Sequence, residues 1–121
     1  MRSLFFFLVL TVISCGKKDS SSLEPLEFDS KLKSSKGAIL LDVRTAAEYS
    51  QGAIANARNI VYDDSFSSKL DSLSKDAPVF VYCASGKRSA KAAEILKEKG
   101  FREVYKLNGG LKAWQKARIP L

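Results

Sequence analysis

Val79-Phe80-Val81-Tyr82-Cys83-Ala84-Ser85-Gly86-Lys87-Arg88-Ser89 has the pattern of a buried strand, a tight loop and the start of a helix. Four β-branched or aromatic residues after Pro78 predict the strand. The alanine-rich, charged run 90–99 predicts the helix, with Gly100 as its stop. Cys83 is therefore expected where unpaired backbone N–H groups and the helix dipole favour a thiolate. On position alone, a small buried core cysteine is the alternative.

Helical and extended segments alternate along the rest of the chain. The continuous apolar run 38–43 is typical of a central parallel strand, with Asp42 near its end. After a short segment 24–28 broken by Pro25, the remaining expected elements are helices at 30–35, 46–51, 65–73 and 111–117 and strands at 57–60 and 103–107. This alternation predicts an α/β domain with a mostly parallel sheet. Ligands of such sheets bind beyond the carboxyl ends of the strands, where 42–44 and Cys83 lie.

The composition excludes several classes of function. The 121 residues suffice for one domain. The net charge of +7 comes from basic residues that are scattered along the chain and not interleaved with aromatic residues, so nucleic acid is not an expected partner. The chain has no histidine, which excludes Ser-His-Asp and Cys-His catalysis and the usual zinc sites. The two cysteines, Cys15 and Cys83, do not indicate a disulfide framework.

The first residues have the pattern of an export signal. Arg2 precedes a short apolar run at 4–13, which is too short for a transmembrane helix. Val12-Ile13-Ser14-Cys15 resembles the lipobox of bacterial lipoproteins, with an ordinary cleaved signal as the alternative. The expected organisation is a signal peptide at 1–14, lipidated Cys15 with a flexible tether at 15–25, and one domain at 26–121. The expected location is the bacterial cell envelope, with the protein lipid-anchored to a membrane and facing the periplasm or exterior.

Four segments together resemble the single-domain rhodanese family. They are Leu41-Asp42-Val43-Arg44 with Glu48-Tyr49, the segment 52–60, Tyr82-Cys83-Ala84-Ser85-Gly86-Lys87-Arg88-Ser89, and Leu107-Asn108-Gly109-Gly110-Leu111-Lys112-Ala113-Trp114. The segment 52–60 departs from the family pattern, because Ala53, Ala55 and Asn56 replace its usual His, Pro and Gly. Asn56 still tolerates the positive φ that glycine would supply. The resemblance implies a three-layer α/β domain with a mostly parallel sheet of about five strands.

The resemblance also implies sulfur transfer. A small anionic donor such as thiosulfate gives its outer sulfur to Cys83, and a thiol or cyanide acceptor takes it from the persulfide. Loop residues Ala84, Ser85, Gly86, Lys87, Arg88 and Ser89 are expected to hold the thiolate and the donor through backbone amides and positive charge. No cofactor or metal is implied, and the domain is expected to be a monomer.

Two further residues are predicted to support the loop. Asp42 is expected to accept hydrogen bonds from backbone or from an arginine such as Arg88, and Arg44 is expected to pair with Glu48. Structural roles are favoured for both, since buried ion pairs are commonly structural. Donor binding by Arg44 is the alternative.

Two rival functions remain open. Related phosphatases and arsenate reductases place five residues between Cys and Arg, whereas four separate Cys83 from Arg88 here. The shorter loop suits a sulfur atom better than a tetrahedral oxyanion. The second rival is a non-catalytic persulfide carrier or binding module. The predicted sulfurtransferase is favoured because Cys83, Gly86, Arg88 and Ser89 are all present.

Overall fold

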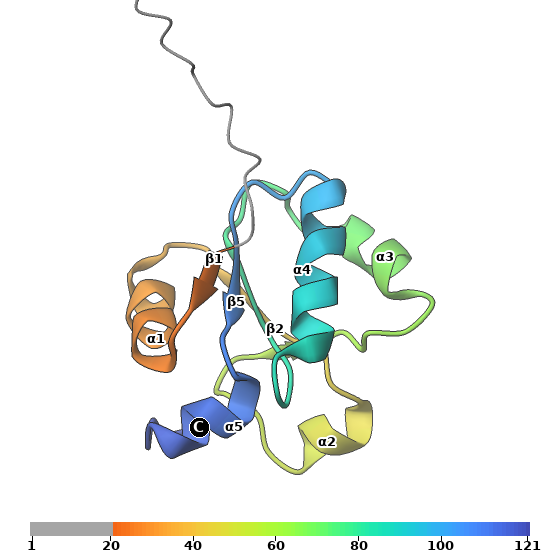
Figure 1. Cartoon of the computed structure of the whole chain (residues 1–121). Helices are drawn as coiled ribbons and strands as arrows, with labels where there is room; N and C mark the ends of the chain where they lie inside the picture. Colours follow the sequence, from red (N-terminus) through yellow and green to blue (C-terminus); the bar gives the residue numbers. More distant parts are fainter. Residues whose placement is uncertain (1–20) are drawn as a thin grey trace, which may run out of the picture.

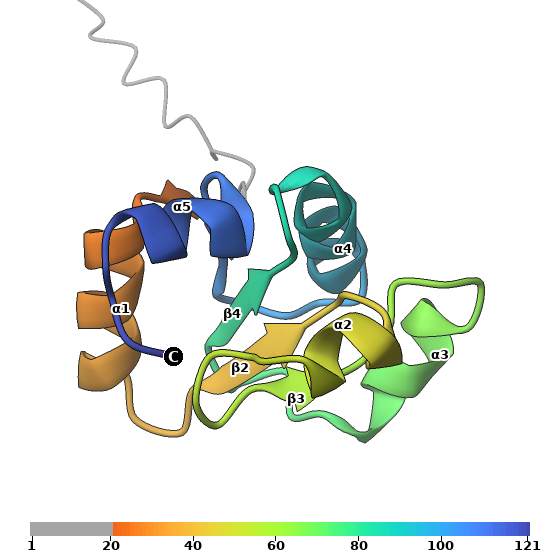
Figure 2. The ribbon, with the colours of Figure 1, turned by 90° about the horizontal axis from the view of Figure 1, so that it is seen from below.

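The computed structural model describes residues 21–121, which form a parallel five-stranded sheet between two layers of helices (Figures 1 and 2). The strand order is β1-β5-β4-β2-β3, and each neighbouring pair is parallel. The strands are β1 (Ser21–Leu23), β2 (Ile39–Asp42), β3 (Arg58–Asn59), β4 (Val79–Tyr82) and β5 (Val104–Leu107). The helices are α1 (Pro25–Ser34), α2 (Ala46–Ser50), α3 (Phe66–Lys69), a 3-10 turn η1 (Leu70–Ser72), α4 (Lys87–Glu98) and α5 (Gly110–Lys116). The predicted α/β class and parallel sheet are confirmed.

Both faces of the central strands are buried, which explains their unbroken apolar runs. Successive side chains of a strand point to opposite faces. Leu41 and Val81 therefore pack toward α3 and α4, whereas Leu40 and Phe80 pack toward α1 and α5. Figure 2 shows α1 and α5 on one side of the sheet and α3 and α4 on the other. Trp114 of α5 lies in the α1–α5 layer, in edge-to-face contact with Phe28 at 6.2 Å between centroids.

Two expectations about the start of the domain are wrong. The residues of β1 were predicted to lie in a flexible tether, but they pair with β5, and Leu23 aligns with Leu107. The folded part therefore begins before the predicted boundary at 26. The first helix was predicted at 30–35, but it begins at Pro25. Proline suits this first position, where its missing N–H has no intrahelical partner in any case.

Other local predictions hold. The helix predicted at 46–51 is α2, which Thr45 caps in a reciprocal capping box with Glu48, and the strand predicted at 57–60 is β3. Asn56 has φ +69°, the conformation expected where the family has glycine. The helix α4 begins at Lys87, slightly before the predicted start at 90.

The predicted signal peptide and Cys15 lie outside the described residues. Within residues 21–121, the helices are all too short or too polar to span a bilayer.

Candidate active site

Cys83 directly follows β4 at the carboxyl edge of the sheet, and its side chain is buried. The next residues turn sharply at Gly86, which has φ +101° and precedes α4. This conformation favours glycine, because a Cβ atom would strain it. The turn aims the Gly86 N–H at the sulfur, with 3.1 Å between the nitrogen and Sγ. The thiol of Cys83 in turn donates to Ser89 Oγ at 3.4 Å.

These contacts control the charge of the thiol. Burial alone raises the pKa of Cys83, but hydrogen bonds from the Ser89 hydroxyl and from the backbone amides of Ser89, Gly86 and Ser85 outweigh it. The net pKa of the Cys83 thiol is therefore lowered from its ordinary value. The Ser89 hydroxyl donates to Gly86 O at 3.2 Å while it accepts from the thiol. It needs only to rotate to donate to the thiolate instead, so this loop stabilises the nucleophilic form without histidine.

Asp42 and Arg44 pair with each other, so the predicted Asp42–Arg88 and Arg44–Glu48 pairs are wrong. Asp42 is fully buried, and its carboxylate accepts hydrogen bonds from Arg44 Nη2 at 2.7 Å and from Arg44 Nε at 3.0 Å. Asp42 also accepts the Arg44 backbone N–H, as the predicted acceptance from backbone required. Arg44 continues to the carbonyl of Gly52 at 2.7 Å. The pair fixes the conformation of the segment that follows β2. In the register between β2 and β4, Asp42 lies beside Tyr82.

Arg88 pairs with Glu48 in a two-pronged geometry. Its Nη1 and Nη2 lie 2.7 Å and 3.0 Å from the two carboxylate oxygens. Hydrogen bonds from the Arg88 side chain are the main cause that lowers the pKa of Glu48 to about 2. Glu48 is itself held by the backbone and hydroxyl of Thr45. The pair therefore connects the capped start of α2 to the first turn of α4, beside the Cys83 loop.

Two shallow hollows border the loop. One, of about 310 Å³, includes Ala84, Arg44, Glu48 and Lys112 in its lining. The other, of about 380 Å³, is lined by Ser22, Ser85, Gly86, Lys87, Ala90, Lys106, Leu107, Asn108 and Gly109. Lys87 and Lys106 make the second hollow positive, and no carboxylate is among these lining residues. The sequence did not identify Lys106 as a residue of the site, because a lysine within a strand belongs to no recognisable motif. Its parallel pairing in β5 next to β4 brings it there.

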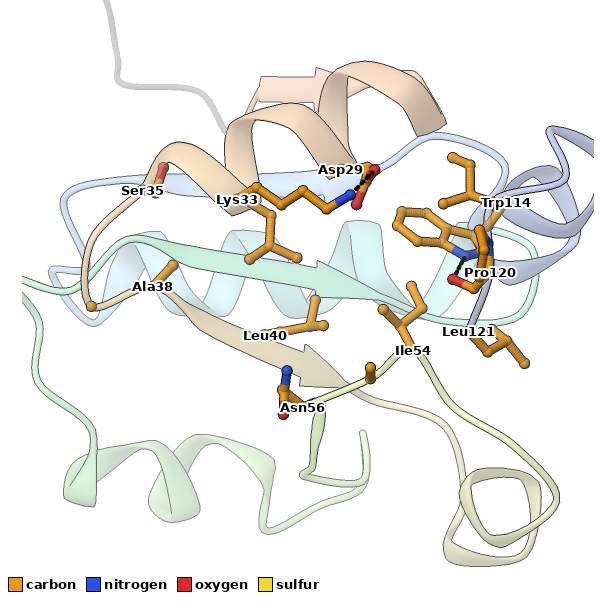
Figure 3. A pocket seen from close by; sticks show the side chains of 14 residues that line it. Asp29, Lys33, Ser35, Ala38, Leu40, Ile54, Asn56, Trp114, Pro120 and Leu121 are labelled. Carbon is orange, nitrogen blue, oxygen red and sulfur yellow. Dashed lines mark hydrogen bonds and ion pairs between the residues drawn. The ribbon is translucent and has the colours of Figure 1, made fainter.

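A larger cavity of about 500 Å³ lies between α1, α5 and the chain end (Figure 3). Leu40, Ile54 and Trp114 form part of its lining, and Trp114 Nε1 donates to Pro120 O at 3.3 Å. Asp29 and Lys33 form an ion pair at 3.0 Å along its wall. None of the residues 83–89 lines this cavity. The two smaller hollows, and not this cavity, therefore border the Cys83 loop.

Metal ligands are not grouped in this part of the chain. Within residues 21–121, no three His, Cys, Asp or Glu side chains are placed to hold a metal ion.

Comparison with known proteins agrees with this arrangement. Residues 24–117 match the family description of the Rhodanese-like domain. The chain is 33% identical to a sulfurtransferase of Allochromatium vinosum over 85% of this chain and 91% of that protein. It is 37% identical to a thiosulfate sulfurtransferase of Coxiella burnetii, covering 81% of this chain and 87% of that protein.

Solved structures and longer relatives extend the comparison. A rhodanese-related protein of Thermoplasma volcanium superposes with a TM-score of 0.72 at 32% identity, covering 83% of this chain and 95% of that one. The chain spans 60% of an uncharacterized Bacillus subtilis relative and 33% of a Pelagibacter ubique tRNA uridine(34) hydroxylase. With the matched region, the parallel sheet and the Cys83 loop in agreement, the chain belongs to the family of proteins with a rhodanese-like domain.

Proposed function

We propose that the protein is a sulfurtransferase that moves sulfane sulfur from thiosulfate, or a similar small anion, to a thiol or cyanide acceptor. The observation that carries the proposal is the Cys83 sulfur itself, which lies within a loop whose amides and Ser89 hydroxyl favour thiolate. Relatives named as sulfurtransferases cover nearly the whole domain, which supports the same reaction class.

The proposed reaction consists of two displacement steps at sulfur, and neither step requires a cofactor to supply or remove electrons. The Cys83 thiolate attacks the outer sulfur of thiosulfate, and sulfite leaves with the electron pair of the broken S–S bond. The new sulfur remains on Cys83 as a persulfide anion. The acceptor then attacks that outer sulfur, forming thiocyanate when the acceptor is cyanide and restoring the Cys83 thiolate. The loop amides that stabilise the first thiolate also suit the persulfide anion, because both are buried anions at nearly the same place.

The charges around the loop favour an anionic donor. Arg88 is engaged in its ion pair with Glu48. Lys87 and Lys106, by contrast, line the hollow of about 380 Å³ that Ser85 and Gly86 also line. We assign donor approach to that hollow, where two positive charges attract thiosulfate and sulfite can leave into solvent. Arg44 is engaged by Asp42 and Gly52, which supports a structural role for Asp42 and Arg44.

Sulfur transfer is tested by thiocyanate formation from thiosulfate and cyanide. The full chain is expected to turn over, and Cys83→Ser is expected to be inactive. Cys15→Ser serves as the matched thiol control and is expected to keep the activity. A generic aryl phosphate offered in parallel tests the phosphatase alternative, and hydrolysis that requires Cys83 would overturn the proposal. Formation of a persulfide without thiocyanate turnover would instead indicate a carrier.

We also infer that Cys15 is lipidated and anchors the protein in the bacterial cell envelope. The support is the lipobox-like segment 12–15 after an apolar run. Several acyl chains on one cysteine give firm attachment, where a single chain does not. Detergent phase partitioning of the full chain tests this inference. The wild type is expected in the detergent phase and Cys15→Ser in the aqueous phase, and identical partitioning of the two would contradict it.

A further inference from the structure

The start of α5 packs directly against the backbone of the Cys83 loop. Leu111 N–H donates to Cys83 O at 2.8 Å, and Lys112 N–H donates to Ala84 O at 3.1 Å. The first N–H groups of a helix have no partner within the helix, so these two are free to bind the loop carbonyls. Figure 1 shows α5 beginning next to the turn that joins β4 to α4. Two successive carbonyls of the loop are thereby turned toward α5.

Gly110 is what permits this approach. Its φ is +63°, a conformation that side chains rarely adopt. A Cβ atom at this position would lie 2.6 Å from Cys83 O and 2.6 Å from the carbonyl carbon and oxygen of Ala84. Contacts that short do not occur for real Cβ atoms, and the obstructing atoms are backbone, which cannot swing aside as a flexible side chain would. Any larger residue must therefore push α5 away from the loop.

We propose that Gly110 is a positioning residue for sulfur transfer, which holds the Cys83–Ala84 carbonyls against α5 so that the following amides face the Cys83 sulfur. The geometry follows from the peptide planes, because a carbonyl fixed toward α5 restricts where the next N–H groups point. The Ala84 carbonyl shares its peptide plane with the Ser85 N–H, which is one of the amides that hydrogen-bond the Cys83 sulfur. The Gly86 N–H follows directly and lies 3.1 Å from the sulfur. The role differs from that of a residue that only packs α5 against the rest of the domain. The significance of the residue rests on the proposed function, but the thiol itself can be measured without any turnover.

The test compares two glycine substitutions with the same backbone strain. Gly110→Ala and Gly37→Ala both place alanine at a positive φ, +63° and +68°, but a Cβ at Gly37 meets nothing within 4 Å. Iodoacetamide labelling of the full chain across pH, followed on the tryptic peptide 76–87, reports Cys83 separately from Cys15. At pH 6 the labelling rate of Cys83 is expected to fall about tenfold in Gly110→Ala, the effect of losing one hydrogen bond to a charged group.

The control decides between positioning and general strain. Gly37→Ala is expected to label like wild type, with its kcat for sulfur transfer retained, whereas Gly110→Ala loses kcat more than it raises KM. An unchanged Cys83 labelling profile in folded Gly110→Ala would overturn the proposal, as would an equal change in Gly37→Ala. Because labelling needs no sulfur donor, an inactive wild type would refute the proposed function and leave this test intact.

A second measurement on the wild type covers the case in which Gly110→Ala does not fold. The backbone amide proton signals of Leu111 and Lys112 are followed by NMR as Cys83 titrates in the ¹⁵N-labelled full chain. Both signals are expected to move with the thiol midpoint, because their acceptors are the carbonyls of Cys83 and Ala84. The movement is expected to vanish in Cys83→Ser. Signals that stay fixed through the thiol titration would overturn the proposal.

Discussion

The ion pair between Glu48 and Arg88 gives a quantitative prediction. From the sequence alone, Arg44 is the expected partner of Glu48, and Asp42 is the expected partner of Arg88. In the structure Arg88 binds both oxygens of Glu48, and Asp42 rather than Glu48 holds Arg44. Replacing Glu48 with glutamine removes one charge and keeps the shape of the side chain. The change should release Arg88 and loosen the contact between α2 and α4.

The expected loss of stability follows from the carboxyl group. The pKa of Glu48 falls from an ordinary 4.5 to about 2, which on its own corresponds to about 3 kcal/mol. Both side chains are 35% exposed, so water and salt screen the pair and its net worth is reduced to about 1 kcal/mol. In a domain of this size, such a loss lowers Tm by about 4–8 °C.

A double-mutant cycle in urea unfolding isolates the interaction. Glu48→Gln, Arg88→Gln and the double variant are expected to show a coupling energy of about 1 kcal/mol at pH 7. Because the folded pKa is depressed, the coupling is fully present above the unfolded pKa near 4.5 and disappears as pH falls toward 2. The matching cycle of Glu48 with Arg44 is expected to show no coupling. A negligible Glu48–Arg88 coupling, or an equal Glu48–Arg44 coupling, would refute the assigned pairing.

Three further substitutions test other parts of the site. Ser89→Ala removes a hydrogen bond that lowers the pKa of Cys83, so the pH profile of Cys83 alkylation should move upward, and an unmoved profile would contradict this role. Asp42→Asn strips the buried Arg44 of its counter-charge and should lower the free energy of unfolding by about 3 kcal/mol, so a loss below about 1 kcal/mol in urea would count against the pair. Lys106→Gln should raise KM for thiosulfate at low salt more than the control Lys91→Gln does, because Lys106 lines the hollow beside Gly86 and Lys91 does not. Equal KM values for the two variants would refute the approach of the donor through that hollow.

Local sequence signals predicted most of the fold. The apolar runs around Leu41 and Val81 and the tight turn that contains Gly86 are each specified within a few residues, and all of them appear as expected. The strand β1 was missed because Ser21-Ser22-Leu23 is polar and short, and only its pairing with β5 makes it a strand.

Side-chain pairing in the site could not be predicted in the same way. Asp42, Arg44, Glu48 and Arg88 offer two ways to form ion pairs, and the four-residue spacing of Arg44 and Glu48 favours the pairing that the structure does not have. The choice depends on Arg44 bending back to Asp42 and to the Gly52 carbonyl, which leaves Glu48 facing Arg88. Gly110 was missed as a positioning residue for a related reason, since its contact with Cys83 and Ala84 joins segments far apart in sequence.

The central claim is that Cys83 forms a persulfide, and intact mass measurement tests it most directly. The full chain carrying Cys15→Ser is incubated with thiosulfate, freed of excess donor and weighed before and after cyanide. We predict a gain of one sulfur atom that cyanide removes and that is missing when Cys83→Ser is added. A folded protein that never gains this sulfur, or gains it equally without Cys83, would contradict the account.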